Sequence, residues 1–446
     1  MSLTYVHVSD IHFGQERGAD VYVHNDVKQC LIADVAQLQA AAGIERVDGI
    51  IVTGDIAFSG KKSEFDVAAQ WLDDLTGAVG CKKTDVIVVP GNHDIDRDRI
   101  SAGAAAMLRQ SFKGGSAELE RFLSHAGDRE LLYEKFHDYR AFAEGYDCPL
   151  QHNGGVAVNR TAEIAQGRSL RFVGFNTALL CMGLDDDDGN LLIGCRQHVL
   201  PRTPGEELVV LCHHPLRSLQ DHEDVSQYIN SRARVHIYGH VHRPSVEVST
   251  PVEGGDLLTI SAGAAVPPRT GDGYQYTYNV LTFEWDADCD GLRIEIVPRS
   301  WNKQATMFDA DTRQLGESRR KYILRCPNFR NQAAAAGVSA AKNDVRIEAR
   351  QATTRKPLRD SAAGRDIAEN RDLLRLYFFR DLSEAQRIRA LIEVGILSEE
   401  WTIELTHTVE RRLLDQALRS GLQDGLATAV AVLRREGATV EGGGAR

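Results

Sequence analysis

Short runs of β-branched, apolar residues recur along the chain up to residue 238, and each run ends in a polar loop. The runs cover residues 5–8, 49–52, 86–89, 208–212 and 235–238, and amphipathic helical patterns follow the first two, at residues 19–42 and 65–72. Short apolar runs of branched side chains predict buried strands. Their alternation with amphipathic helices predicts an α/β fold.

Further strand patterns lie downstream of the first three runs. They extend from Val156 to Asn176 and cover residues 257–261, 278–285 and 292–301, with glycine-containing turns between them. Since these patterns have the length and composition of strands, they predict another sheet that packs on the first. We therefore expect two packed β-sheets flanked by helices.

Residues 99–148 interrupt this alternation with helical spacing, notably of Leu132 and Phe136. The pattern predicts a helical insertion beside the strands. As a lid over a site, the insertion would bring Arg109, Lys113 or Arg121 to a phosphate group. A solvated charged face is the simpler interpretation of each of these side chains.

The sequence pattern changes twice in the C-terminal third of the chain. Residues 331–370 are rich in alanine and charge and predict a linker, and residues 371–446 show short amphipathic helices. Ser383 and Gln386 form a capping-box pattern, and Gly395 matches a helix end. Because residues 371–446 contain no cluster of His, Asp and Glu, we expect a small all-α domain for protein contact, or an appendage that stabilises a dimer.

The amino-acid composition excludes several classes of protein and of site. The chain has 446 residues, 43% of them hydrophobic and 26% charged, as in ordinary globular proteins. Its eight cysteines include no Cys-x-x-Cys, which argues against a disulfide framework or a thiolate zinc site. A net charge of −11 argues against a chain built to hold a long nucleic-acid duplex. No secretory signal pattern or membrane-length apolar run is present, which predicts a cytoplasmic protein with no membrane contact.

Polar side chains cluster in the loops that follow the five apolar runs. They are Asp10, His12, Asp55, Asn92, a histidine at 213 or 214, His240 and His242. Ligands gather at the carboxyl ends of strands in open α/β sheets, so we expect these side chains to meet. Oxygen and imidazole donors without sulfur suit two divalent metal ions, such as Mn, Fe, Zn, Ni or Co.

In this order the motifs Asp-x-His, Gly-Asp, Gly-Asn-His-Asp, His-x-Pro and Gly-His-x-His resemble those of the calcineurin-like metallophosphoesterase family. The likeness covers about the first 330 residues, and residues 8–14 and 54–60 look closest to the cyclic-nucleotide phosphodiesterase-like branch. It implies a four-layer sandwich of two sheets and flanking helices. The C-terminal helices resemble death-fold-like, effector-associated adaptor domains of prokaryotic signalling and defence proteins.

The resemblance also implies roles for individual residues. One metal ion would be held by Asp10, His12, Asp55 and His242, and the second by Asp55, Asn92, His213 and His240. The family's His-x-Pro spacing selects His213 rather than His214. A hydroxide that bridges the ions would attack the phosphate. His93 would protonate the leaving oxygen, and Asp94 would orient His93 and favour its charged form.

These observations predict a metal-dependent phosphodiesterase or phosphatase in prokaryotic signalling or defence, whose C-terminal domain binds a protein partner. Its substrate would be a phosphoester, with a nucleotide or a nucleic acid among the candidates, and an oligomer is compatible with the sequence. One alternative is a nuclease that acts on DNA or RNA. Another is a protein-interaction module in which the metal ions serve only structure.

Overall fold

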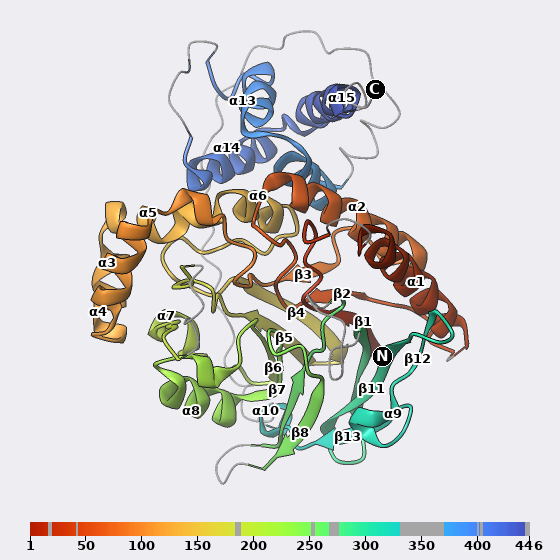
Figure 1. Ribbon diagram of the computed structural model, residues 1–446. Coiled ribbons are helices and arrows are strands. Elements are labelled where there is room, and N and C mark those ends of the chain that lie inside the picture. Colours follow the sequence, from red (N-terminus) through yellow and green to blue (C-terminus); the bar gives the residue numbers. More distant parts are fainter. Residues whose placement is uncertain are drawn as a thin grey trace. The chain divides into compact units, whose positions relative to one another are not determined.

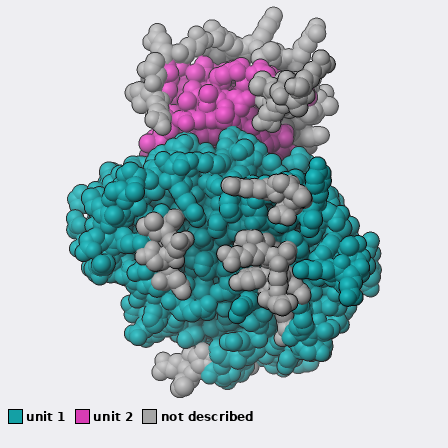
Figure 2. Space-filling view, in the orientation of Figure 1, with its two compact units in different colours: residues 1–330 teal, residues 331–446 magenta. Residues whose placement is uncertain are grey.

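The computed structural model describes residues 1–16, 20–41, 43–182, 189–250, 255–266, 276–330, 370–398, 401 and 405–441. The contacts divide the chain into two units, residues 1–330 and residues 331–446, which Figure 2 distinguishes by colour. Of the predicted linker at 331–370, all but Asn370 lies outside the described residues.

The first unit contains a sheet whose strand order is β12-β11-β10-β1-β2-β3, with β13 paired to β11 (Figure 1). The strands are β1 (Ser2–Val8), β2 (Gly49–Val52), β3 (Val86–Val88), β10 (Thr277–Asp286), β11 (Gly291–Asn302), β12 (Met307–Ala310) and β13 (Arg320–Leu324). Strands β1, β2 and β3 run parallel, so their carboxyl ends meet at one edge. Strands β10, β11, β12 and β13 continue the sheet through antiparallel pairings.

The second sheet has the order β4-β5-β6-β7-β9-β8. Its strands are β4 (Val158–Ala165), β5 (Arg168–Gly174), β6 (Glu206–Leu211), β7 (Ala233–Tyr238), β8 (Ser245–Ser249) and β9 (Leu257–Ser261). The central strands β5, β6, β7 and β9 are parallel. Strand β8, at the sheet's edge, is mostly exposed, which explains why its sequence gave little strand signal.

Aromatic side chains join the two sheets. The Tyr5 ring of β1 lies 5.0 Å from the Phe172 ring of β5, and the Phe283 ring of β10 lies 6.1 Å from that of Phe172. All three side chains are buried, so the two sheets share one core. The prediction of two packed sheets is confirmed.

Helices cover the outer faces of both sheets (Figure 1). Helices α1 (Asp20–Ala41) and α2 (Lys62–Val79) flank the first sheet, and α7 (Cys195–His198) and α8 (His222–Arg232) flank the second. The buried face of α2 includes Phe65, Ala68 and Leu72, as its periodicity predicts. Two short helices, α9 (Thr312–Leu315) and α10 (Pro327–Arg330), complete the described helices at the end of this unit.

The segment between β3 and β4 is helical. It contains η1 (Arg97–Arg99), α3 (Ala102–Phe112), α4 (Ser116–Ser124), α5 (Ala126–Tyr133), η2 (Glu134–Phe136) and α6 (His137–Gly145). Lys135 is 1% exposed, and its ammonium group donates to the carbonyls of Leu179 and Cys181 at 2.7 Å each. The lysine thereby ties the helical segment to the loop after β5, because a buried charge needs such partners.

The second unit is helical in its described part, with α12 (Arg371–Leu376), the π-helical η5 (Tyr377–Asp381), α13 (Glu384–Glu393), α14 (His407–Arg419) and α15 (Gln423–Glu441). Ser383 and Gln386 form the predicted capping box at the start of α13. Arg387 of α13 donates to the buried Glu410 of α14 at 2.9 Å. None of the helices in the described ranges is long and apolar enough to cross a membrane.

Candidate metal centre

Five loops meet where the two sheets adjoin. They follow β1, β2 and β3 of the first sheet and β6 and β7 of the second. Backbone hydrogen bonds fix them to one another: Asp10 N–H donates to the Gly54 carbonyl at 3.0 Å, and Gly239 N–H donates to the His213 carbonyl at 2.9 Å. Side chains that are far apart in the sequence are therefore held together by main-chain geometry.

The backbone itself is strained at these loops. Among the described residues, eight that are not glycine have a positive φ, and five of the eight are predicted metal ligands. These five are Asp10 (53°), His12 (52°), Asp55 (53°), His240 (68°) and His242 (52°). Positive φ is unfavourable for residues with a Cβ and tends to cluster at functional sites. The strain therefore marks the centre independently of its side chains.

Two glycines of the motifs leave room for side chains of the centre. A Cβ on Gly91 would lie 2.2 Å from Asp55 Oδ1, and a Cβ on Gly239 would lie 2.2 Å from Ser9 Oγ. Both distances are well below the van der Waals contact distance of non-bonded atoms. Close approach of the backbone thus explains glycine in the Gly-Asn-His-Asp and Gly-His-x-His motifs.

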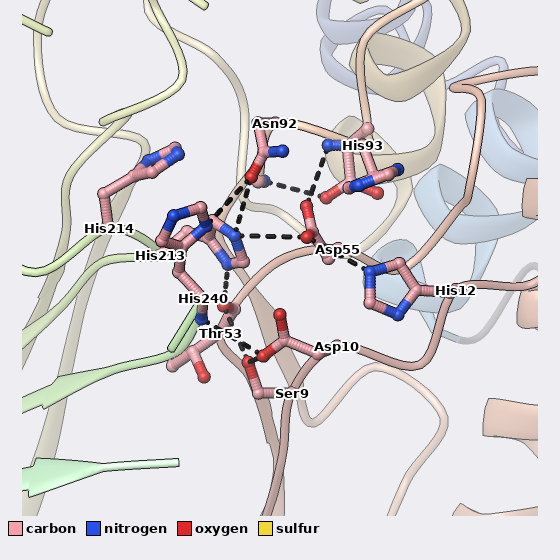
Figure 3. A network of polar contacts seen from close by, with 12 residues as sticks. Ser9, Asp10, His12, Thr53, Asp55, Asn92, His93, His213, His214 and His240 are labelled. Atoms are coloured by element: carbon pink, nitrogen blue, oxygen red, sulfur yellow. Dashed lines mark hydrogen bonds and ion pairs between the residues drawn. The ribbon is translucent and has the colours of Figure 1, made fainter. Parts of the chain in front are cut away.

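The Asp55 carboxylate occupies the middle of the centre (Figure 3). Its Oδ2 atom lies 3.3 Å from His12 Nε2 and 3.3 Å from His213 Nε2. Its Oδ1 atom accepts a hydrogen bond from His93 N–H at 2.8 Å. One carboxylate thus faces two groups of side chains on opposite sides.

The first group comprises Asp10, His12 and His242. Asp10 Oδ1 lies 3.0 Å from His242 Nε2, and Asp10 Oδ2 accepts from the Ser9 hydroxyl at 2.6 Å. His12 Nδ1 lies 3.3 Å from the Val266 carbonyl, which can only accept a hydrogen bond. This contact places the Nδ1 proton and leaves His12 Nε2 facing the carboxylates.

The second group comprises Asn92, His213 and His240. Asn92 Oδ1 lies 3.1 Å from His213 Nε2 and 3.2 Å from His240 Nδ1. His213 Nδ1 donates to the Thr53 carbonyl at 2.8 Å. His213 Nε2 therefore carries a lone pair in the neutral ring, and it points at two oxygen acceptors, Asn92 Oδ1 and Asp55 Oδ2.

Neighbouring His214 is held away from the Asp55 carboxylate. Its Nδ1 atom lies 2.9 Å from the Thr177 hydroxyl, and its backbone N–H donates to the same oxygen at 3.1 Å. The His214 ring nevertheless lies 4.6 Å from the His240 ring, so it borders the second group. Of the two histidines left open by the residue pattern, His213 is the one beside Asp55 and Asn92.

Neighbouring charges outweigh the effect of burial on the pKa values of two side chains in the centre. Burial opposes the charged form of His213, but the Asp55 carboxylate outweighs it and raises the pKa of His213 to about 9. Burial likewise opposes the charge of Asp10, yet the charge of His242 lowers the pKa of Asp10 to about 2. The Asp10 and Asp55 carboxylates therefore stay ionised at neutral pH, and a cation bound beside Asp55 would take the place of the proton that this carboxylate holds on His213.

His93 lies beside the centre, and the group that contacts its ring is not the Asp94 carboxylate of the prediction. Its Nδ1 atom donates to the Phe58 carbonyl at 2.8 Å, and the Phe58 ring stacks on the imidazole at 5.2 Å. The Asp94 carboxylate accepts from the N–H groups of Gly91 and Ala57 instead, at 2.8 Å each. Asp94 therefore fixes the loop, and the Phe58 carbonyl takes the orienting role expected of it.

Burial is the largest cause of the pKa shifts of both groups, Asp94 and His93. Burial, followed by the charge of Asp55, raises the pKa of Asp94 to about 7. Burial is also the main reason that the pKa of His93 falls below its ordinary value. The Asp94 carboxylate is hydrogen-bonded to the Gly91 and Ala57 N–H groups, and the His93 ring to the Phe58 carbonyl, so the geometry gives no support to an orienting role for Asp94.

The donor atoms fit divalent cations. Four overlapping groups of three have donor atoms within 4.8 Å of one another, namely Asp10–His12–His242, Asp10–Asp55–His213, His12–Asp55–His93 and His213–His214–His240. The carbonyls of Thr53, Phe58 and Val266 hold the imidazoles in place. Sequence reasoning missed these carbonyls, since a backbone oxygen has no residue-type signal.

The fold and this donor set define a domain of the metallohydrolase class. The chain belongs to the calcineurin-like phosphoesterase family, whose model matches residues 3–244. The family consists of metal-dependent phosphoester hydrolases that use a dinuclear divalent metal centre, and the groups around Asp55 are candidate ligands of that kind. The family prediction from the ordered motifs is confirmed.

Two curated relatives are similar to the chain. It is 23% identical to the metallophosphoesterase-like protein YydB of Bacillus subtilis (strain 168) over 341 residues, which are 73% of this chain and 65% of the relative. It is 34% identical to the glycerophosphodiester phosphodiesterase GpdQ of Enterobacter lignolyticus (strain SCF1) over 88 residues, which are 20% of this chain and 28% of that protein. The chain thus spans less than two thirds of either relative.

Among solved structures, the purple acid phosphatase PPD1 from yellow lupin (Lupinus luteus) seeds is 12% identical, with a TM-score of 0.38. The match covers 77% of this chain and 57% of that one. In the second unit, residues 370–431 match the model of the GTPase-associated adaptor domain. The prediction of an adaptor-like helical domain is thereby confirmed.

Proposed function

We propose that residues 1–330 hydrolyse phosphoesters at two divalent cations that share Asp55. Asp10, His12, Asp55 and His242 would hold one cation, and Asp55, Asn92, His213 and His240 the other. The observation that carries the proposal is the convergence of acceptors: two Nε2 atoms lie 3.3 Å from the same carboxylate oxygen, Asp55 Oδ2. Lone pairs that face one another need a proton or a cation between them.

Two cations in such a centre activate a water molecule and offset the charge on a phosphoester. The protein groups contribute orientation. The Val266 and Thr53 carbonyls fix which nitrogen of His12 and of His213 faces the centre. The Ser9 hydroxyl holds one oxygen of Asp10, which leaves Oδ1 toward His242. Donors fixed in this way lose little freedom when an ion binds.

His93 is the proposed proton donor to the leaving oxygen. Because its Nδ1 proton is held by the Phe58 carbonyl, Nε2 is the nitrogen that can carry the transferred proton. Burial lowers its pKa, so a proton on Nε2 is released more readily than from a solvated imidazole. His93 is half-buried, which leaves it partly accessible to a substrate.

A phosphodiester is the substrate class that we favour within the proposal. The segment shared with a glycerophosphodiester phosphodiesterase, at 34% identity, supports it. A nuclease is the neighbouring alternative, since nucleic acids are phosphodiesters too. The matched adaptor domain supports a role in signalling or defence, in which residues 370–431 bind a protein partner.

Substitution of Asp55 or Asn92 by Ala tests the proposal. Both variants should lose hydrolysis of bis-p-nitrophenyl phosphate by more than roughly 100-fold, assayed with Mn, Fe, Zn, Ni and Co in turn. Asp288→Ala, an exposed carboxylate in the turn between β10 and β11, is the matched control and should keep full activity. Unchanged turnover by metal-loaded Asp55→Ala would refute the proposed centre.

A further inference from the structure

The Phe58 ring lies against the imidazole of His93, the proposed proton donor. Phe58 belongs to the loop after β2, and His93 belongs to the loop after β3. The centroids of the two rings are 5.2 Å apart, and the ring planes differ by 25°. This is the geometry of a stacked pair, in which aromatic rings attract each other. The Phe58 side chain thus forms part of the surroundings of the proton donor, although it carries no group that titrates or binds a metal ion.

The Asp94 carboxylate fixes these two loops to each other. It accepts a hydrogen bond from the N–H group of Ala57, which precedes Phe58, at 2.8 Å. It also accepts from the N–H group of Gly91, two residues before His93, at 2.8 Å. Because Asp94 is fully buried, water does not compete for these bonds. Contacts of the main chain therefore bring the Phe58 ring to His93.

The imidazole of His93 needs a neighbour to fix its plane. The χ2 torsion of histidine has broad minima, so the side chain does not set the plane by itself. The hydrogen bond from His93 Nδ1 to the Phe58 carbonyl, at 2.8 Å, directs one nitrogen but tolerates a range of angles. The stacked Phe58 ring restricts the plane itself. On another side the His12 ring borders the imidazole at 4.9 Å, with its plane turned by 89° (Figure 3 shows both histidines).

The plane of the imidazole decides where its Nε2 atom points. In the proposed reaction the proton on Nε2 passes to the leaving oxygen as the P–O bond breaks, and this requires Nε2 within hydrogen-bond reach of that oxygen. His93 also forms, with His12 and Asp55, one of the groups whose donor atoms lie within 4.8 Å of one another. An imidazole that turns freely can therefore approach a cation instead. A contact that holds the plane keeps His93 available for proton transfer.

We propose that Phe58 is a positioning residue for the reaction: its ring holds the imidazole of His93 in the plane that directs Nε2 to the leaving oxygen. The inference rests on the proposed function and adds to it a residue that is no metal ligand. Phe58 acts only through His93. Its substitution should therefore affect reactions that need a proton on the leaving group and leave the others nearly unchanged.

Two thymidine diesters with different leaving groups measure this role in the full chain. Thymidine 5′-ethyl phosphate releases an alkoxide that needs a proton, whereas thymidine 5′-p-nitrophenyl phosphate releases a weakly basic phenolate. F58A should lower kcat for the ethyl ester by about tenfold, a part of the roughly 100- to 10,000-fold that proton transfer supplies, and by less than about threefold for the p-nitrophenyl ester. KM should stay within about twofold of the wild-type value for both esters.

Conservative variants separate the flat ring from its volume. F58Y keeps the ring and should retain wild-type kinetics, whereas F58L keeps an apolar side chain without a flat face and should resemble F58A. The pair also decides the question if F58A does not fold. Wild-type kinetics of F58L, or equal losses of kcat for the two esters in the Phe58 variants, overturns the inference.

A double substitution and a matched control test whether Phe58 acts through His93. In the H93A background, F58A should cause no further loss with the ethyl ester, since the group that it positions is absent. A further loss there overturns the inference. Y228A is the control: Tyr228 is half-buried like Phe58, and its ring lies 5.3 Å from the ring of another histidine, His198. This variant should keep wild-type kinetics with both esters.

Nuclear magnetic resonance of the metal-free chain separates this inference from the proposed function. With ¹⁵N-labelled histidine, the Nδ1–H signal of His93 is identified by its absence in H93A. Its exchange with water should be slow in the wild type and F58Y, and faster by about tenfold or more in F58A and F58L. Equal exchange in all four overturns the inference while hydrolysis itself stands. Absence of hydrolysis of either ester refutes the proposed function, and the exchange rates then still decide whether the Phe58 ring holds His93.

Discussion

The two ends of strands β6 and β7 carry buried polar clusters of opposite kinds. At their amino ends, Glu207 accepts from Arg234 at 3.2 Å and from the backbone and side chain of Asn328 at 2.9 and 3.3 Å. At their carboxyl ends, His213 and His240 face oxygen acceptors. The first cluster balances its charge with protein groups. The second cluster balances its charge only when protons or cations are added. This difference distinguishes a structural cluster from a candidate functional site.

Backbone conformation follows the same division. The residues at the carboxyl ends include His240 and His242 with positive φ, whereas Glu207 and Arg234 lie within strands and do not have a positive φ. A fold accepts such strain where surrounding contacts enforce it. Substitutions at the two ends should therefore affect different quantities, activity at one end and stability at the other.

The largest effect is expected from His93→Ala. Removal of the proposed proton donor should lower kcat by about 100- to 10,000-fold for an alkyl phosphoester. The loss should be smaller for a p-nitrophenyl ester, whose leaving group needs less protonation. Steady-state kinetics with both esters measures the difference, and His125→Ala, at an exposed position, serves as the control. Equal losses for both leaving groups would assign His93 a role other than proton transfer.

At the opposite end, Arg234→Met should destabilise the fold. Arg234 is 1% exposed, and its loss leaves the buried Glu207 carboxylate without its charged partner. Such a change costs about 3–5 kcal/mol of unfolding free energy. Urea unfolding at pH 8 measures it, with turnover per folded molecule as the second readout. A stable variant with impaired turnover would contradict the proposed division between the two ends.

Protonation of Glu207 should also make the free energy of unfolding depend on pH. Burial is the largest cause that raises its pKa from 4.5 to about 7, although Arg234 opposes the shift. The folded state then holds a proton that the unfolded state has released, so this contribution is full below about pH 4.5 and is lost as the pH rises through 7. The expected loss is on the order of 3 kcal/mol. Denaturant unfolding from pH 4.5 to 8 should show it in the wild type, and Glu207→Gln should flatten this part of the profile.

The smallest effect is expected from Ser9→Ala. The Ser9 hydroxyl donates to Asp10 Oδ2 at 2.6 Å and is not itself one of the proposed ligands. Partners of metal ligands typically contribute about 10- to 100-fold to metal affinity. Calorimetric titration with Mn²⁺ should show a loss in this range while the fold stays intact. An affinity equal to that of the wild type would mean that backbone geometry alone orients Asp10.

The sequence was sufficient to predict the strands that lead into the site, because each β-branched run is followed directly by a polar motif there. It was also sufficient to predict that the ligand side chains lie close together. Each of their loops follows a parallel strand, and parallel strands end at one edge of a sheet. It was insufficient for the contacts of Asp94, whose partners are N–H groups of Gly91 and Ala57 brought together only by the fold. The short strands β8 and β12 were likewise missed, because edge pairing depends on neighbours distant in the sequence.

The number of divalent ions bound per chain tests the central claim most directly. Mass spectrometry of the intact chain under native conditions, after loading with Mn²⁺, should find two ions in the wild type. Each group of ligands can be emptied separately, so His242→Ala and His240→Ala should each bind one ion tightly, and Asp55→Ala should hold neither at the wild-type affinity. A single ion in the wild type, or two tightly held ions in Asp55→Ala, would contradict a shared carboxylate at the core of this protein.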